Sequence, residues 1–458
     1  MSTNIQKNQI TEGIIWRQLL LFFFPILLGT FFQQLYNTID SVIVGQFVGK
    51  EALAAVGGSS AQIVAFVVGF FTGLSSGASV TIAQFFGAKD SRSANKGLHT
   101  AYAIAAFGGL ILTVSGIILT PFLLEMMNPP ADIVADSAVY LRIYFAGIIF
   151  VLIYNMGSAI LRATGDSKRP LYYLIVCCII NIVLDVLFVI VFHMGVMGVA
   201  VATLIAQAVS AVLVTLKLMR SEGILKLSVK QIRFHGSILK MQLKLGLPTG
   251  FEAILFSITN IAIQSAVNTF GTDTTAAWSA YGKLDAIFWM VSTAFGIAIT
   301  TFVGQNYGAG KMDRVRKSTR VCLLMDFIVS AVLVVFLIAA RFLLFRLFTN
   351  DSHVIEIGCD MLVLITPWYI VYVFIEVIAG ALRGVGNVVV PVAITLLGVC
   401  VLRIAWLAAM LKISPTISAI ILSYPVTWVI TALAFIIYYI YITHKTIAGS
   451  SKKHVPKL

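Results

Sequence analysis

Apolar residues fill long runs of about 20 positions along this chain, and short polar segments separate the runs. A run of this length is long enough to cross the hydrocarbon core of a bilayer as an α-helix. We count about twelve runs, and this pattern predicts an all-α polytopic membrane protein with twelve transmembrane helices. The runs are centred near residues 27, 66, 110, 147, 180, 206, 256, 291, 332, 371, 397 and 430.

The composition and the charge distribution support a membrane location. Of the 458 residues, 59% are hydrophobic and only 11% are charged, whereas soluble domains average roughly 25% charged residues. The net charge of +13 would suggest a nucleic-acid partner in a soluble protein. Here most lysines and arginines fall in alternate loops, as the positive-inside rule requires when both termini are cytoplasmic. We therefore expect a cell-membrane protein with cytoplasmic termini and no nucleic-acid partner.

The two halves of the chain repeat each other. "IAQFFGAKDSRSANK" at residues 82–96 matches "VGQNYGAGKMDRVRK" at 303–317, and "ILRATGDSKRP" at 160–170 matches "ALRGVGNVVVP" at 381–391. The offset is 221 residues in both cases, from 82 to 303 and from 160 to 381. Six helices return the chain to its starting side, so the second half enters the membrane in the same orientation.

This repeat predicts the domain organisation. We expect two six-helix lobes related by a pseudo-twofold axis along the membrane normal, with a central cavity between them. Residues 1–219 are assigned to the N-lobe and 241–458 to the C-lobe. The stretch 220–240, in which basic and apolar residues alternate, is assigned to a cytoplasmic basic linker.

The first apolar run contains a carboxylate, Asp40, near the centre of "GTFFQQLYNTIDSVIVGQFVG". A charged group inside a membrane-spanning helix is costly, and such groups are functional far more often than not. No motif for nucleotide binding or metal coordination accompanies it: the cysteines and histidines lack metal-ligand spacing, and "GQNYGAGKM" lacks the Ser/Thr and the preceding strand of a phosphate-binding loop.

Several segments in combination resemble the multidrug and toxic compound extrusion (MATE) family. They are "PILLGTFFQQLYNTIDSVIVGQFVGKEALAAVG", "QFFGA", "QNYGAG", "LRATGDSKRP" and "GLPTGFE", and the likeness covers nearly the whole chain. The resemblance implies a secondary active antiporter rather than an enzyme. It would export small amphiphilic, often cationic organic compounds from within the bilayer, with protons or sodium ions as the coupling ion and no other cofactor. We expect a monomer.

The resemblance also implies site residues. Asp40 matches the acidic residue of the first helix, and Asn181, Asp185 and Thr203 match polar positions of the DinF-like subgroup. Glu252 and Glu376 look like the second-half carboxylates of the NorM-like subgroup. The chain thus carries marks of both subgroups, and the coupling ion stays open.

The spacing of these residues explains how they could work. Asn181 and Asp185 are four residues apart and share one helix face. If that face packs against Asp40, two carboxylates in a low-dielectric pocket cannot both stay charged, so they would share a proton or hold a sodium ion. The corresponding second-half residues Ile263, Leu402 and Trp406 cannot do this, so we expect ion coupling in the first half only.

Candidate wall residues of the substrate cavity are aromatic or sulfur-containing. Aromatic faces attract organic cations, and methionine adapts to varied shapes. For any one of these residues, packing in the core or facing lipid is the commoner role. Glu252 and Glu376 would form the substrate or second ion site together with Tyr36, Met156, Phe256 and Met290, and Trp278 and Trp289 are further wall candidates.

Two other functions remain as alternatives. A lipid-linked precursor flippase of the same superfamily would need a cationic cavity for pyrophosphate, and the intramembrane charges are mainly acidic. A polytopic transferase would need a cluster of catalytic carboxylates or histidines in an outer loop, and these loops are short.

Overall fold

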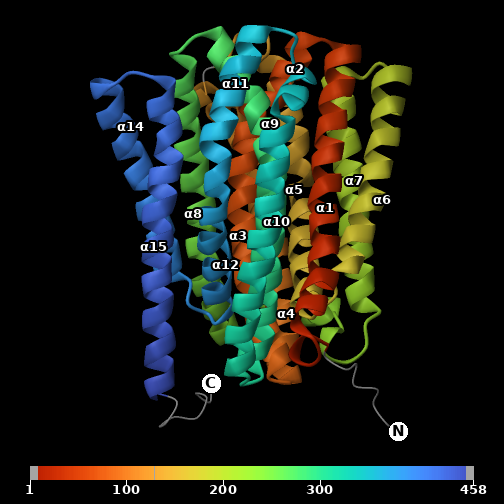
Figure 1. The fold of residues 1–458 in the computed structure, drawn as a ribbon. Coiled ribbons are helices and arrows are strands. Elements are labelled where there is room, and N and C mark those ends of the chain that lie inside the picture. The colour runs from red at the N-terminus through yellow and green to blue at the C-terminus, as the bar shows by residue number, and fades with distance from the viewer. Residues whose placement is uncertain (1–8, 128, 450–458) are drawn as a thin grey trace. The chain divides into compact units, whose positions relative to one another are not determined.

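The computed structural model describes residues 9–127 and 129–449, and these residues form helices and turns without any strand. Twelve helices within the described chain are long and apolar enough to cross a membrane (Figure 1). The predicted fold class, an all-α polytopic membrane protein of twelve spans in two lobes, is confirmed. The extreme termini, whose side of the membrane was predicted, lie outside the described residues.

The helices follow one another with short connections. The first half contains η1 (Gln9–Thr11), α1 (Ile15–Ile43), η2 (Val44–Val48), α2 (Lys50–Gly57), α3 (Ser59–Gly87), α4 (Ser91–Met127), α5 (Val134–Ala163), α6 (Lys168–Asp185), η3 (Val186–Val191) and α7 (Gly195–Met219). The linker contains η4 (Gly223–Leu225) and η5 (Val229–Gln231). The second half contains α8 (Gly236–Asn268), α9 (Thr272–Gly308), α10 (Met312–Arg346), α11 (Ser352–Ile365), η6 (Thr366–Trp368), α12 (Tyr369–Gly384), α13 (Val389–Thr395), η7 (Leu396–Val401), α14 (Leu402–Ile413) and α15 (Ile417–Gly449).

Contacts divide the chain into two compact units. The N unit is Phe22–Ala253, and the C unit combines Met1–Leu21 with Ile254–Leu458. This division departs from the sequence repeat at two helices, because the start of α1 packs with the C unit and the first half of α8 packs with the N unit. The lobe boundaries drawn from the repeat stay a prediction.

Basic residues of the α9–α10 turn fix the segment before α1 within the C unit. The Arg314 guanidinium donates hydrogen bonds to the carbonyls of Ile10, Glu12 and Gly13, and the Lys311 ammonium donates to the carbonyl of Thr11 at 2.8 Å. Charge-assisted bonds of this kind are about twice as strong as neutral ones. They explain why residues before α1 belong to the C unit.

Two pairs of glycines join α8 to α3 inside the N unit. Gly73 and Gly77 on α3 face Gly250 and Gly246 on α8, and each pair is spaced as G-x-x-x-G. A Cβ atom on Gly77 would overlap the backbone of Gly246, and one on Gly73 would overlap the backbone of Gly250. Small residues let membrane helices approach backbone to backbone, and these four hold the start of α8 against α3.

Replacement of Gly77 tests this contact. Gly77→Ala is expected to lower the free energy of unfolding by about 1–3 kcal/mol, because α3 and α8 must move apart. Gly282→Ala is the matched control, since that helical glycine has open space around its Cβ position and alanine should stabilise it by about 0.5–1 kcal/mol. Thermal unfolding of both purified variants in detergent measures the difference. A Gly77→Ala protein that melts at or above the wild-type temperature would contradict the close approach.

The linker lies along the start of α4 in the N unit. The Asn95 amide donates to the Lys226 carbonyl at 3.2 Å, and the Ser228 N–H donates to Nε2 of His99 at 3.0 Å. Burial, followed by the nearby cations Arg233 and Lys96, lowers the pKa of His235 in the linker. The positive charge of the linker and of the α3–α4 turn therefore gathers at one end of this unit.

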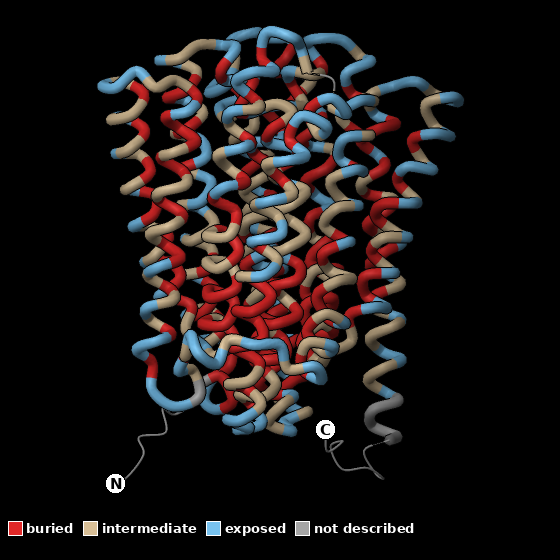
Figure 2. The backbone as a smooth tube through the Cα atoms, turned by 180° about the vertical axis from the view of Figure 1, so that it is seen from behind, coloured by how far each residue is buried: buried red, intermediate tan, exposed pale blue. Residues whose placement is uncertain are grey.

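Exposed residues recur along many of the helices (pale blue in Figure 2), and many large apolar residues are among them. Examples are Ile118 on α4, 69% exposed, and Leu343 on α10, 68% exposed. Large exposed apolar surfaces are rare on soluble monomers but are the normal surface of a protein that faces lipid.

Candidate functional site

Two buried carboxyl groups face each other in the N unit. Asp40 on α1 is 8% exposed, and Asp185, the last residue of α6, is fully buried. The two groups lie near enough for one, when protonated, to donate to the other. The structure thus brings together the two carboxylates that the sequence predicted to meet.

Three helix faces surround this carboxyl pair. Tyr36 and Asp40 lie one turn apart on α1, and Asn181 and Asp185 lie one turn apart on α6. The third face belongs to α7. Its Gln207 amide donates a hydrogen bond to the Tyr36 hydroxyl at 3.4 Å, so this face of α7 points toward α1. Thr203 lies one turn before Gln207 on the same buried face.

Buried polar atoms without partners mark this pocket. Apart from the bond that the two carboxyl groups can share when one is protonated, no group among the described residues forms a hydrogen bond with either oxygen of Asp185 or with Oδ1 of Asp40. The same holds for both amide atoms of Asn181 and for the Thr203 hydroxyl. A buried polar atom left unpaired costs about 1–3 kcal/mol. The oxygens among them form a hard donor set, which suits a proton or a sodium ion.

A π-helical turn follows each of the two carboxylates. The turn η3 begins directly after Asp185, and η2 begins four residues after Asp40. Val44 of η2 and Val189 of η3 pack in one buried apolar cluster. Such turns are rare, they occur mostly as single-turn bulges inside α-helices, and these bulges are frequent at functional sites. Sequence reasoning missed both, and only the run of β-branched residues in "VLFVIV" hinted at the second.

Comparison with known proteins agrees with this architecture. The sequence matches the model of the MatE family over residues 25–187 and again over residues 248–407. The chain belongs to the MATE family. The two matches also confirm that the halves repeat each other, because each begins at the proline that opens its half, Pro25 or Pro248.

The relatives and structural neighbours of this MATE protein are transporters. It is 30% identical over 393 residues to the probable multidrug resistance protein YoeA of Bacillus subtilis, with 84% of each chain covered. It is 27% identical over 420 residues to the probable multidrug resistance protein NorM of Thermotoga maritima, covering 89% of this chain and 88% of NorM. A solved MATE structure in a bent conformation superposes with a TM-score of 0.91 at 20% identity, covering 98% of this chain and 99% of that one.

A MOP superfamily transporter from Pyrococcus furiosus superposes with a TM-score of 0.90 at 20% identity, covering 99% of this chain and all of the other. At such identities these structures show the fold alone. The family assignment makes the chain a membrane transporter rather than an enzyme.

The second-half carboxylates of this MATE chain lie in different units. Glu252 is buried in the N unit, whereas Glu376 is on α12 of the C unit. The Glu376 carboxylate fills the space beside Gly296 of α9, and Arg383 donates to it at 2.9 Å. Arg383 forms an ion pair with Glu376, whereas Lys283 on α9 is exposed.

The C unit holds a buried carboxylate that sequence reasoning missed. Asp326 on α10 is fully buried, its Oδ1 accepts a hydrogen bond from Ser330 at 3.2 Å, and its charge interacts with that of Glu376. Its Oδ2 has no partner among the described residues. A carboxylate within an apolar run singled out Asp40 as a candidate site residue. The same argument applies to Asp326, because its surroundings in "LLMDFIVS" are equally apolar.

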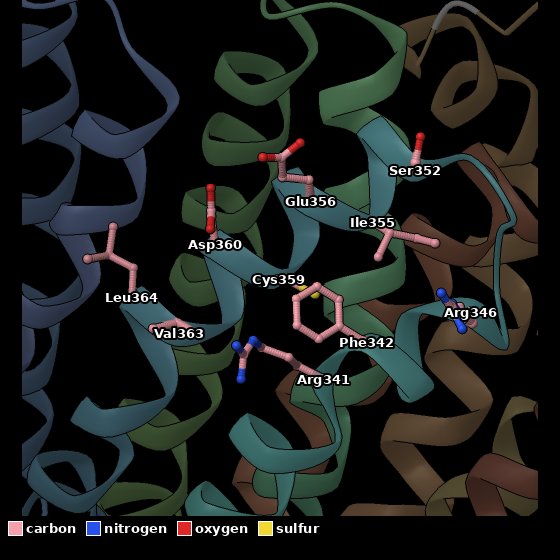
Figure 3. A pocket seen from close by; sticks show the side chains of 10 residues that line it. All are labelled: Arg341, Phe342, Arg346, Ser352, Ile355, Glu356, Cys359, Asp360, Val363 and Leu364. Carbon is pink, nitrogen blue, oxygen red and sulfur yellow. The ribbon is translucent and has the colours of Figure 1, made fainter.

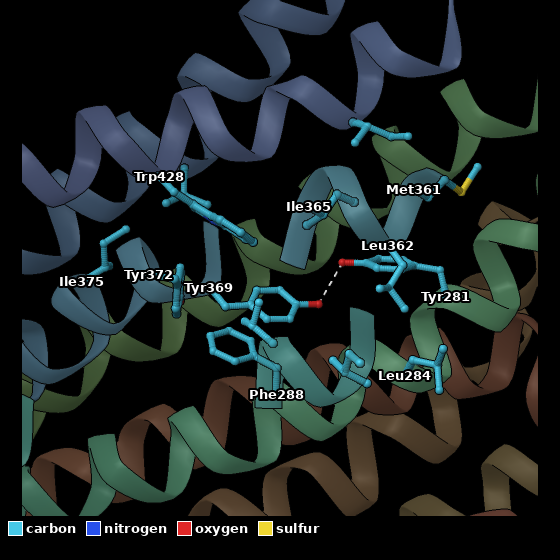
Figure 4. Close-up of a cluster of buried hydrophobic side chains, with 14 of the residues drawn as sticks. Tyr281, Leu284, Phe288, Met361, Leu362, Ile365, Tyr369, Tyr372, Ile375 and Trp428 are labelled. Carbon is cyan, nitrogen blue, oxygen red and sulfur yellow. Dashed lines mark hydrogen bonds between the residues drawn. The ribbon is translucent and has the colours of Figure 1, made fainter. Parts of the chain in front are cut away.

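A second carboxylate to which the sequence assigned no role, Asp285, bonds to two tyrosines of the aromatic cluster of the C unit, Tyr281 and Tyr369, which Figure 4 shows. It accepts hydrogen bonds from the Tyr281 and Tyr369 hydroxyls and from Nε1 of Trp289, the last at 2.7 Å. The two hydroxyls also bond each other at 3.0 Å. The signal was present in the sequence, since Tyr281, Asp285 and Trp289 recur every four residues on one face of α9.

The predicted wall residues have varied surroundings. Tyr36 belongs to the carboxylate pocket through its bond with Gln207. Met156 is 2% exposed within the apolar core of the N unit, so it serves packing in this conformation. Phe256 packs against the aromatic cluster of the C unit, as do Trp278 and Trp289, and Met290 is half-buried on α9.

Proposed function

We propose that this protein is a secondary active antiporter that exports amphiphilic, cationic organic compounds in exchange for protons or sodium ions. The observation that carries this proposal is the buried pair Asp40 and Asp185, with its set of unpartnered oxygens. The pair can take up a monovalent cation or a proton, and uptake removes the repulsion between two buried charges. The names of the relatives, multidrug resistance proteins, support the substrate class.

The pocket could couple ion and substrate through the packing of α1 against α6 and α7. A ligand shifts a conformational equilibrium only by the difference in its affinity for the two states. When charged, the carboxyl pair repels, and when it holds a proton or sodium ion it draws the helix faces together. The π turns after both residues are places where the helix can change its hydrogen bonding at low cost.

The direct test imposes each gradient separately on proteoliposomes. A pH gradient alone and a sodium gradient alone are applied while a fluorescent organic cation is followed. Uptake driven by one gradient identifies the coupling ion. Uptake driven by neither gradient would remove the antiporter proposal.

We further propose that the linker faces the cytoplasm, on the positive-inside rule. Glu222→Cys, exposed in the linker, should resist an impermeant thiol reagent in intact cells, while Asp132→Cys, exposed between α4 and α5, should react within minutes. The native cysteines are all buried, so their background labelling is low. Labelling of Glu222→Cys from outside would reverse the topology.

A further inference from the structure

An open cavity of about 810 Å³ lies in the C unit, between the last turns of α10 and the first turns of α11 (Figure 3). Four charged side chains line it: Arg341 and Arg346 from α10, and Glu356 and Asp360 from α11. Buried Ile355 and Cys359 also line it, and the ring of Phe342 adjoins the Arg341 guanidinium at 4.7 Å.

These four charges do not neutralise one another. Among the described residues, none of them takes part in an ion pair, although charges of both signs line the same cavity. Arg341 donates one N–H to the Ile338 carbonyl at 2.8 Å, which leaves its other donors free for a ligand. A ligand that carries both a negative and a positive group would complement this arrangement.

The surroundings of the cavity are apolar and exposed. Phe342 is 53% exposed, Leu343 68% and Val363 42%, and they lie on the same turns as the charged residues. Such side chains contact lipid tails where a helix leaves the hydrocarbon layer. In Figure 3 the two carboxylates line the α11 side of the cavity, and Arg341 and Arg346 line the α10 side.

We propose that this cavity binds the headgroup of a phospholipid with an ethanolamine group. The phosphate would bond to the arginines, because guanidinium groups match phosphate oxygens well. The ammonium, which lies farther from the acyl chains, would donate to Glu356 and Asp360. The acyl chains would follow Phe342 and Val363. A choline headgroup fits less well, because its quaternary ammonium donates no hydrogen bond and Phe342 is the one aromatic ring among the lining residues.

The test measures lipid retained by the purified full-length protein in detergent, by native mass spectrometry with added dioleoyl phosphatidylethanolamine or phosphatidylglycerol. The wild-type protein should hold the ethanolamine lipid about tenfold more tightly, a difference of about 1.4 kcal/mol. Glu356→Gln with Asp360→Asn should abolish this preference and keep affinity for both lipids. Arg341→Gln with Arg346→Gln should weaken both lipids by about tenfold.

A matched control changes charges that do not line the cavity, Lys412→Gln with Glu125→Gln, both exposed. This control should retain the wild-type preference. Equal binding of the two lipids by the wild type, or an unchanged preference in the carboxylate variant, would overturn the proposal. Melting temperatures without added lipid verify that all variants fold, so the outcome does not depend on transport.

Discussion

The Asp40→Asn protein is expected to fold and to bind substrate, yet to lose gradient-driven export by at least about a hundredfold. The asparagine fixes a neutral side chain beside Asp185, so the repulsion between two buried carboxylates can no longer be switched on and off. Without that switch an ion has little differential affinity for the two states, and the gradient cannot drive the cycle. The energy at stake is considerable, because one charge crossing a potential of 100 mV yields about 2.3 kcal/mol.

Two measurements on the same preparation distinguish loss of coupling from loss of structure. Export is followed in proteoliposomes, and substrate affinity is measured at equilibrium with varied pH and sodium. For Asp40→Asn the affinity should persist but should no longer respond to the coupling ion. Asp185→Asn should weaken coupling in the same direction. Asp136→Asn, an exposed acid at the start of α5, is the matched control and should transport normally. An Asp40→Asn protein that pumps at the wild-type rate would remove this mechanism.

The sequence predicted the helices and the carboxylate pocket because both follow from short-range patterns. Apolar runs of membrane length define the spans, and the four-residue spacing of Asn181 and Asp185 defines a shared helix face. That Asp40 meets this face is a tertiary contact: the family resemblance implied that these are site residues, and their meeting was only a condition of the sequence argument. The π turns were not predicted, because the patterns on which the prediction rests do not distinguish a π turn from an α-helix.

Other features of the fold were not predictable from the repeat. The backbone contact between Gly77 and Gly246 assigns the start of α8 to the N unit, although the repeat places α8 in the second half. Likewise, Arg383 lies two turns after Glu376 on the same face of α12, and its long side chain reaches back to the carboxylate, a distance beyond the one-turn spacing that the sequence was searched for. Glu376 is therefore neutralised within its own helix, and a cationic substrate would have to compete with Arg383 for it.

The aromatic cluster around Asp285 has two candidate roles, structural packing and substrate binding, because aromatic rings beside a carboxylate are also typical of a site for organic cations. In this structure the cluster already contains a cation of the protein. The Arg403 guanidinium lies 4.0 Å from the ring of Tyr424 and donates to Thr427 at 2.9 Å, and its charge acts on Asp285. Three donors and this cation satisfy Asp285 completely, which favours a structural role.

Asp285→Leu is accordingly expected to lower the free energy of unfolding by more than about 3 kcal/mol. The change leaves the Trp289 N–H and one of the two tyrosine hydroxyls short of an acceptor, at about 1–3 kcal/mol each, because the other hydroxyl can still donate to its tyrosine neighbour, and it removes the negative charge that acts on buried Arg403. Asp285→Asn should cost less, because its amide oxygen can still accept from both tyrosines. Thermal unfolding in detergent ranks the stabilities of these two variants. Asp313→Leu, which removes a fully exposed acid on α10, is the control and should change the stability little.

A double variant separates the two contributions of Asp285. If the unpaired guanidinium carries part of the cost, Asp285→Leu combined with Arg403→Leu should be more stable than Asp285→Leu alone, because no buried charge then remains in the cluster. If the hydrogen bonds alone matter, the second change should add its own packing loss and the double variant should be less stable. An Asp285→Leu protein that unfolds at the wild-type temperature would contradict the structural role, and the cluster would then have to be tested as a binding site for cations.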